Sequence, residues 1–395
     1  MNKFVRAEGR NLVTADGRPL HLRGIGLGNW LLVEGYMFRF DGAPQSPREI
    51  ETLLLELAGP DGAAEFWEQY RADYITAEDI GFLRQIGLNS VRVPLHYKFF
   101  ETADGEGFRW LDRLVGWCRE AGLYVIPDLH AAPGGQTGTN IDDGFGHPWL
   151  FASASSQRRL AEVWARIAAH YRDEPAILGY ELLNEPIPPG AGLEELYNSQ
   201  LEPVYRRVTA AIRAVDPHHL IIYGGAQWNT NFSMLGRPFD ARAVYAFHRY
   251  WTATEVSAIR EYLDFGERYQ VPVWCSEAGE NLNEWIAAFR QLLDAHGVGW
   301  AFWPYKKMLA PGERLPFGPA PQMLSTAGLV SFHEPRHWPQ VVRYSKAPLT
   351  VSQVAEKQLS RPTRRETQDC LASLLENIKF KNCPVNTGFI KALGF

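Results

Sequence analysis

The sequence predicts an α/β fold in which eight parallel strands, each followed by a helix, close into a barrel. Two observations support this prediction. Short apolar runs alternate with segments of helical periodicity, and the runs are apolar at consecutive positions, as in strands covered on both faces. No GxGxxG glycine pattern follows the first run, which disfavours the competing arrangement, a doubly wound open sheet.

The chain begins with a predicted hairpin that we expect to plug one end of the barrel. Asp16-Gly17 joins the apolar segments 11–15 and 19–22, and both turn residues tolerate positive φ. The eight predicted strands then follow in order. They cover residues 23–27, 90–94, 124–130, 177–185, 220–224, 244–250, 271–277 and 298–303.

The intervening helices are predicted by their apolar faces and their end signals. Thr76 with Asp79 three residues later can cap a helix start, and Gly87 can end that helix. A second apolar face is closed by Gly122. That second face lies within residues 111–118, and similar faces lie within residues 160–167, 204–212 and 259–269.

We expect one barrel domain over residues 1–345 and a C-terminal extension over residues 346–395. Apolar residues recur in the extension at the spacing of one helix face. They are Leu371, Leu374, Leu375 and Ile378. We expect this helix to pack on the outside of the barrel rather than to form a free arm for a partner.

The composition excludes several classes of function. A net charge of −5 without long charged runs disfavours nucleic acid and membrane surfaces as partners. No stretch is long and apolar enough to span a membrane, and the N-terminus lacks an apolar signal core. We therefore expect a cytoplasmic protein, with secretion of a trimmed form left open. The four cysteines are widely spaced, so we expect no zinc site and no disulfide framework. We also expect no cofactor.

Polar residues stand where the predicted strands end, and in such a barrel the loops above these ends form the concave surface. Glu185 and Glu277 end the fourth and seventh strands. Two carboxylates that face one cavity, one protonated and one ionised, are what hydrolysis of a glycosidic bond requires. Aromatic residues, which bind flat apolar ligands such as sugar rings, make up 13% of the chain.

Six segments of the chain resemble glycoside hydrolase family 5, a family of barrel enzymes. They are SVRVPL, VIPDLH, ELLNEP, YAFHRYW, VWCSEAG and WAFWPYK, in that order. The opening LRGIGLGNWLLVE and the stretch HAAPGGQTG are more similar to the exo-β-1,3-glucanase and β-glucosidase branch than to the endoglucanases. The resemblance covers residues 10 to about 345.

The resemblance implies a retaining β-glucosidase or glucanase that acts on oligosaccharides or small glycosides. Glu277 would be the nucleophile and Glu185 the acid and base. Asn184 would hold the sugar 2-hydroxyl, and Arg92 would favour the ionised form of the nucleophile.

Five further residues are implied in substrate binding or support. Tyr250 and His248 would form hydrogen bonds with the nucleophile and acid/base regions. His130 would bind a sugar hydroxyl, Trp303 would form a platform under the ring, and Glu34 would hold the distal hydroxyls of the terminal sugar.

The chain departs from that branch in the loop over residues 136–144, which alters the end wall of the expected pocket. Alternatives therefore stay open: an endo-glucanase or mannan-degrading enzyme, a transglycosylase, or a catalytically silent carbohydrate-binding barrel.

Several neighbouring residues have simpler expected roles. We expect Glu181 and Glu280 to be structural partners and Lys306 and Lys307 to be a solvated pair. Four tryptophans in the predicted loops are further candidates for sugar platforms. They are Trp30, Trp149, Trp228 and Trp251.

Overall fold

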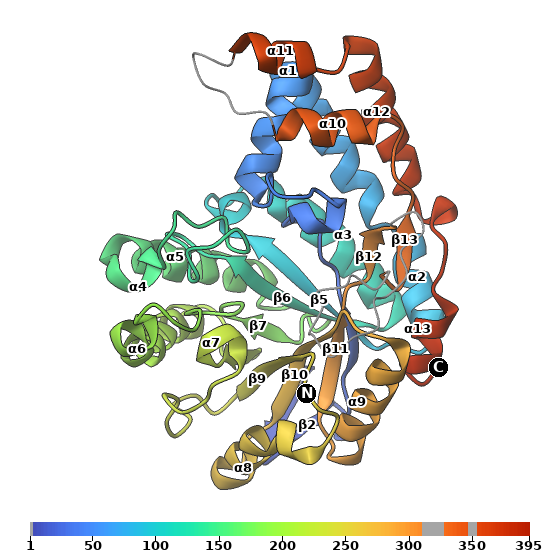
Figure 1. Ribbon diagram of the computed structural model, residues 1–395. Helices are drawn as coiled ribbons and strands as arrows, with labels where there is room; N and C mark the ends of the chain where they lie inside the picture. The colour runs from blue at the N-terminus through green and yellow to red at the C-terminus, as the bar shows by residue number, and fades with distance from the viewer. Residues whose placement is uncertain (1–2, 310–327, 347–353) are drawn as a thin grey trace.

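Eight parallel strands form a closed barrel surrounded by helices (Figure 1). The computed structural model describes residues 3–309, 328–346 and 354–395. The strands follow one another around the barrel in chain order, and the last pairs with the first. They are β4 (Arg23–Gly26), β5 (Ser90–His96), β6 (Tyr124–Ala131), β7 (Gly179–Glu181), β8 (Leu220–Gly224), β9 (Ala243–Tyr250), β10 (Val273–Gly279) and β11 (Gly299–Trp303).

Each predicted strand overlaps one of these eight, which confirms the predicted barrel. The fourth is much shorter than predicted, because only Gly179–Glu181 forms the strand. Ile177 makes an isolated bridge to Val125, and the chain turns away before Glu185, whose φ is 47°. The predicted run 177–185 therefore combines a short strand with the loop that follows it.

The N-terminal hairpin closes the bottom of the barrel, as predicted. It consists of β2 (Asn11–Val13) and β3 (Pro19–Leu20), and β1 (Arg6–Glu8) adds a third antiparallel strand. Val5 and Leu12 are buried in one cluster with apolar side chains of the barrel strands. Those strand residues include Ile126, Leu178, Ile222, Val244 and Trp274.

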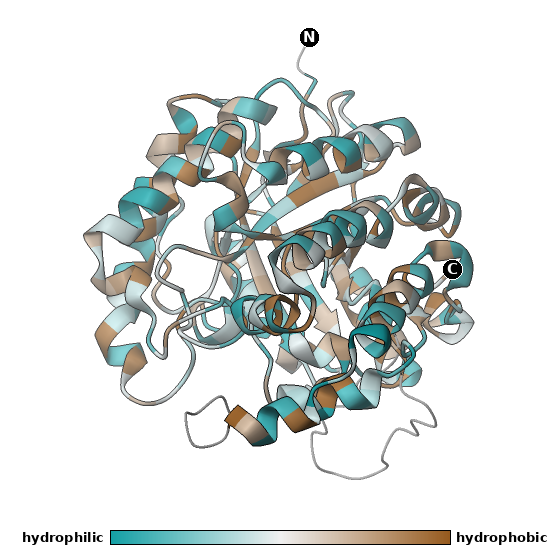
Figure 2. Cartoon of the chain, turned by 90° about the horizontal axis from the view of Figure 1, so that it is seen from above, coloured by the Kyte–Doolittle hydropathy of each residue, from teal (hydrophilic) through white to brown (hydrophobic). Residues whose placement is uncertain are grey.

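Helices follow the strands where the apolar faces predicted them. Thr76 caps α2 (Ala77–Gln85) in a capping box with Asp79, and Gly122 ends α3 (Glu106–Ala121) with a φ of 73°. The predicted faces correspond further to α5 (Ala154–Tyr171), α6 (Leu193–Arg213) and α8 (Arg260–Tyr269). The outer layer also contains α9 (Asn283–Ala295), for which no apolar face was predicted. Figure 2 shows both hydrophilic and hydrophobic residues along the outer helices, as expected where one face packs on the strands.

A long helix, α1 (Pro47–Tyr74), precedes α2 and was not predicted. Ser46 caps it in a capping box with Glu49. Gly59, with a φ of 74°, breaks the helical geometry and leads into Pro60. The helix therefore bends at a glycine and a proline that read in the sequence as a turn.

Three C-terminal helices gather around α1 at one side of the barrel (Figure 1). They are α10 (Trp338–Ser345), α11 (Val354–Ser360) and α12 (Arg364–Asn377), and α12 packs against α1. The last helix, α13 (Thr387–Ala392), packs against α9. The amphipathic helix of the extension, α12, therefore packs on α1. Residues 347–353 of the extension lie outside the described residues.

The remaining described elements include a small parallel sheet and several short helices. In this sheet, β12 (Lys306–Met308) pairs with β13 (Val330–Phe332) directly after the last barrel strand. None of the helices within the described residues has the length and apolar character required to cross a membrane.

Candidate active site

A cavity of about 880 Å³ lies at the carboxyl ends of the barrel strands. Residues on every barrel strand except β5, or in the segment that follows the strand, line this cavity. Predicted site residues make up part of this lining. They are Glu34, His130, Glu185, His248, Tyr250, Glu277 and Trp303. Arg92 and Asn184 are fully buried beneath these residues.

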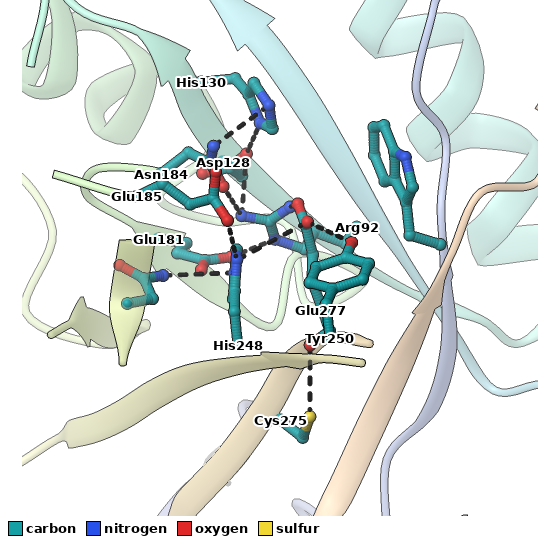
Figure 3. Close-up of polar contacts among 12 residues, drawn as sticks. Arg92, Asp128, His130, Glu181, Asn184, Glu185, His248, Tyr250, Cys275 and Glu277 are labelled. Carbon is teal, nitrogen blue, oxygen red and sulfur yellow. Dashed lines mark hydrogen bonds and ion pairs between the residues drawn. The ribbon is translucent and has the colours of Figure 1, made fainter. Parts of the chain in front are cut away.

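Glu185 and Glu277 face each other in this cavity (Figure 3). Glu277 lies on β10, and Glu185 lies in the loop after β7. One carboxylate oxygen of each residue lies within 4.8 Å of the other. Two carboxylates this close repel each other when both are ionised, so the pair favours a state with one proton.

Both oxygens of Glu277 accept hydrogen bonds. Arg92 donates from a terminal nitrogen to Oε1, and the Tyr250 hydroxyl donates to Oε2 at 2.7 Å. The guanidinium carries a positive charge, and the contact is an ion pair. These are the surroundings that an ionised carboxylate requires.

Glu185 has different surroundings. Its Oε1 lies 2.9 Å from Nδ1 of His248. Burial raises the pKa of Glu185 to about 7, against a smaller opposing effect of His130 and Arg92. The site therefore places a carboxyl group that holds a proton near neutral pH opposite a carboxylate that an arginine stabilises.

Arg92 connects the buried acids beneath the cavity. Its Nε donates to Glu181 at 2.6 Å, and a terminal nitrogen donates to Oδ1 of Asn184 at 2.8 Å. A further ion pair joins it to Asp128 at 3.1 Å. Glu181 was expected to be a structural partner, and it pairs with the Arg92 guanidinium, whose charge a buried carboxylate needs.

Burial keeps the His130 ring neutral, and two neighbours fix its tautomer. Burial lowers its pKa to about 4, and burial also raises the pKa of Asp128 to about 7. Nδ1 of His130 lies 2.8 Å from Asp128, and the side-chain amide of Asn184 lies 3.1 Å from Nε2. An amide nitrogen can only donate, so Nε2 accepts and the ring proton is on Nδ1.

Trp303 lies against the loop that follows β4. A Cβ atom added at Gly26 or Gly28 would lie 2.4 Å or 2.2 Å from its indole ring. The indole nitrogen donates to the Tyr36 hydroxyl at 2.8 Å, and the His130 ring is nearly parallel to the indole at 6.0 Å. The glycines thus allow the indole to lie flat over the backbone at the cavity wall.

The predicted solvated pair of Lys306 and Lys307 is wrong, because both side chains are buried. Lys306 forms an ion pair with Asp79 at 2.7 Å. Lys307 forms one with Glu280 at 2.7 Å, and both of these residues line the cavity. Their acidic partners compensate the desolvation of the two ammonium groups.

Glu34 is 5% exposed and lines the same cavity. Burial raises its pKa well above the usual value, and the neighbouring Glu277 and Glu280 raise it further. Its Oε1 has no hydrogen-bond partner within the described part of the chain. A buried carboxyl group with a free oxygen is suited to a hydrogen bond with a ligand hydroxyl.

The four candidate platform tryptophans separate into two groups. Trp228 and Trp251 line the cavity. Trp30 is buried and donates to the carbonyl of Arg71, and Trp149 is exposed but absent from the cavity lining. The altered loop over residues 136–144 contributes Asn140 and Ile141 to the cavity wall.

Three residues of the site were missed from the sequence. Tyr36 lines the cavity, Gln136 donates to the carbonyls of His130 and Asn184, and Asn229 contacts His248. Gln136 lies in a loop, Tyr36 in the short 3-10 helix η1 (Gly35–Phe38) and Asn229 in the four-residue α7 (Ala226–Asn229). In such short connecting segments no apolar periodicity fixes the position of a side chain. Only their nearness to the predicted strand ends could have indicated them.

One group within the described residues has the donor atoms for a metal ion. It comprises Glu185, His248 and Glu277, whose ligand atoms lie within 4.8 Å of one another. The Arg92 guanidinium already contacts Glu277. A cation at this position would have to lie near that fixed positive charge, so the group fits paired acids better than a metal centre.

Comparison with known proteins adds a family and several relatives. The family model "Cellulase (glycosyl hydrolase family 5)" matches residues 52–308. A β-xylosidase of Phanerodontia chrysosporium is 34% identical over 62% of this chain and 52% of its own length. A probable glucan 1,3-β-glucosidase A of Aspergillus fumigatus is 27% identical over 63% of this chain and 62% of its own length.

Solved structures share the fold. A rutinosidase from Aspergillus niger superposes with a TM-score of 0.59 at 18% identity, covering 73% of this chain and 90% of its own. The chain spans only about half to three fifths of the length of the two sequence relatives.

Proposed function

The chain belongs to glycosyl hydrolase family 5, and we propose that it hydrolyses β-D-glucosidic bonds with retention of configuration, using Glu277 as nucleophile and Glu185 as acid and base. The observation that carries this proposal is the distance between the two carboxylates, at most 4.8 Å between one oxygen of each. Retaining enzymes hold the two groups about 5–5.5 Å apart, whereas inverting enzymes leave about 6.5–9.5 Å for a water molecule.

The first step of the proposed reaction uses the protonated Glu185. Glu277 attacks the anomeric carbon, and Glu185 donates its proton to the glycosidic oxygen as the bond to the leaving group breaks. A pKa of about 7 keeps that proton available near neutral pH. Arg92 and Tyr250 meanwhile hold Glu277 as an ionised nucleophile.

The second step releases the sugar. Glu185, now ionised, accepts a proton from water, the water oxygen bonds to the anomeric carbon, and the bond to Glu277 breaks. Both glutamates return to their starting states. Asn184 is positioned by Arg92 and His130, and we assign it the sugar 2-hydroxyl.

The same proposal assigns the sugar ring to Trp303 and its distal hydroxyls to Glu34. Trp303 presents an indole at the cavity wall, and Glu34 presents a carboxyl oxygen without a partner. A terminal sugar held in this way favours exo-acting cleavage of oligosaccharides or small glycosides. Release of only monosaccharide from a defined β-glucan oligosaccharide would support exo action, and release of internal fragments would contradict it.

A β-xyloside is the second candidate substrate, because the β-xylosidase is 34% identical over 259 residues. The two sugars differ by the hydroxymethyl group at C5. A panel of aryl β-glucosides and aryl β-xylosides assayed side by side distinguishes the candidates by kcat/KM.

The decisive test of the mechanism is Glu277→Gln. We expect this variant to lose turnover by several orders of magnitude while its circular dichroism stays unchanged, because the amide cannot act as the nucleophile. Glu267→Gln, on the exposed face of α8, is the matched control and should keep full activity. Near-native turnover of Glu277→Gln, or a product of inverted configuration by NMR, would reject the assignment.

A further inference from the structure

Three consecutive residues after β8 have left-handed backbone conformations. Gln227, Trp228 and Asn229 lie in α7 (Ala226–Asn229) with φ values of 47°, 60° and 57°. Such conformations are unfavourable for residues other than glycine and persist only where the surroundings enforce them. Gln227 is fixed by a backbone hydrogen bond to Ile187 at 2.9 Å. The turn thus holds the side chain of its last residue in a defined place.

That side chain is Asn229, which is fully buried. It packs on Gly224, where an added Cβ would lie 2.3 Å from the amide oxygen. The amide nitrogen lies 3.2 Å from Nε2 of His248. The amide oxygen has no partner among the described residues. Among the described residues, the side chain of Asn229 therefore forms its hydrogen bond with His248.

This hydrogen bond determines where His248 carries its proton. Burial lowers the pKa of His248 to about 4, so the ring is neutral near neutral pH. The amide nitrogen of Asn229 can only donate, so Nε2 accepts and the single ring proton lies on Nδ1. Nδ1 is 2.9 Å from Oε1 of Glu185. The charged or titratable groups around the ring are Arg92, His130, Glu181, Glu185 and Glu277.

We propose that Asn229 is a positioning residue that fixes the His248 tautomer and thereby leaves Oε2 of Glu185 to carry the proton for the leaving group. This inference rests on the proposed function of Glu185. Because Oε1 accepts a hydrogen bond from Nδ1, a proton on Glu185 occupies Oε2. The opposite tautomer would present a lone pair at Nδ1 and would draw the proton to Oε1, away from the glycosidic oxygen.

The first test is Asn229→Asp, which replaces the donor to Nε2 by an acceptor. General acid catalysis contributes about 10²–10⁴-fold in rate. We therefore expect kcat/KM to fall on the order of 100-fold for phenyl β-glucoside, whose leaving group needs a proton. For 2,4-dinitrophenyl β-glucoside, whose leaving group departs without a proton, we expect a fall of less than about 5-fold.

Asn231→Asp is the matched control. Asn231 lies two residues further along, donates to Oε1 of Gln227 at 2.8 Å and accepts from the backbone of Ser233 at 2.9 Å. We expect this variant to lower kcat/KM equally for the two glucosides, if at all. An equal loss for both glucosides in Asn229→Asp, or no loss, would overturn the proposal.

The second test does not depend on activity, and its wild-type measurement does not depend on the folding of a variant. Nitrogen NMR of the histidine rings in the wild-type protein identifies the protonated nitrogen of His248. We expect the proton on Nδ1 in the wild type and a mixture of tautomers in Asn229→Ala. A proton on Nε2 in the wild type would overturn the inference. A wild-type protein inactive on every glycoside would instead reject the proposed function and leave the tautomer result standing.

Discussion

Replacing Arg92 by methionine should destabilise the protein strongly and in a pH-dependent way. The guanidinium is fully buried and forms ion pairs with Asp128, Glu181 and Glu277. Methionine preserves most of the volume but leaves these acids without their cation. Removal of one partner of a buried ion pair costs about 3–5 kcal/mol, and we expect a loss of at least that size in the free energy of unfolding at pH 8.

The pH dependence follows from the acids that remain. Burial already raises the pKa of Asp128 to about 7 in the folded protein, and Arg92 opposes this effect. An acid whose pKa is raised by folding makes the folded state less stable as pH rises from its unfolded value, about 3.9, through its folded value. Without Arg92 the folded pKa rises further. The deficit of Arg92→Met should therefore be larger at pH 8 than at pH 5, where the acids bind protons.

Urea denaturation of the wild type and the variant at both pH values measures this deficit. Arg109→Met is the control, because Arg109 forms an ion pair with Glu68 in which both side chains are about half exposed (52% and 51%). Such surface pairs contribute at most about 1 kcal/mol. The reasoning would be refuted if the free energy of unfolding of Arg92→Met at pH 8 lay within about 1 kcal/mol of the wild-type value. It would also be refuted if the variant lost the same free energy of unfolding at both pH values.

Two further predictions concern activity. The rate of glucoside hydrolysis should fall as pH rises through about 7, because burial raises the pKa of Glu185 to that value and the first step needs its protonated form; a pH–rate profile that is flat from pH 6 to pH 9 would contradict this. Gly28→Ala should raise KM at least about 10-fold, because its Cβ would lie 2.2 Å from the indole of Trp303 and displace the ring. Gly116→Ala in α3, where the added Cβ meets no atom within 4 Å, is the control and should leave KM unchanged in the same assay.

The barrel could be predicted because its signals are local. Each strand is a short run of apolar residues, and Thr76 and Gly122 mark helix ends within a few residues. The long helix α1 could not be recognised as one element. Its Ser46 and Glu49 capping box was readable, but Gly59-Pro60 is typical of a turn, and only the tertiary structure carries the helix across it.

The positions of candidate site residues could be predicted where these residues lie at the end of a strand. Glu277 and Tyr250 belong to strands, so their positions follow from the barrel itself. The burial of Lys307 could not be predicted, because its partner Glu280 lies 27 residues away and their contact exists only in three dimensions. Asn229 was missed for a similar reason, because its position depends on a left-handed turn that no pattern in the sequence predicts.

The packing of the C-terminal helices on α1 has a consequence for biosynthesis. Lys357 forms an ion pair with Glu56 at 2.9 Å, and Arg361 donates to the carbonyl of Leu57 at 3.1 Å. This side of α1, which the ribosome makes early, is therefore covered only when the last part of the chain has been made. The nascent protein exposes that side of the helix throughout elongation, so a polypeptide that stops near residue 345 would be a target for chaperones and proteases even with its barrel strands complete.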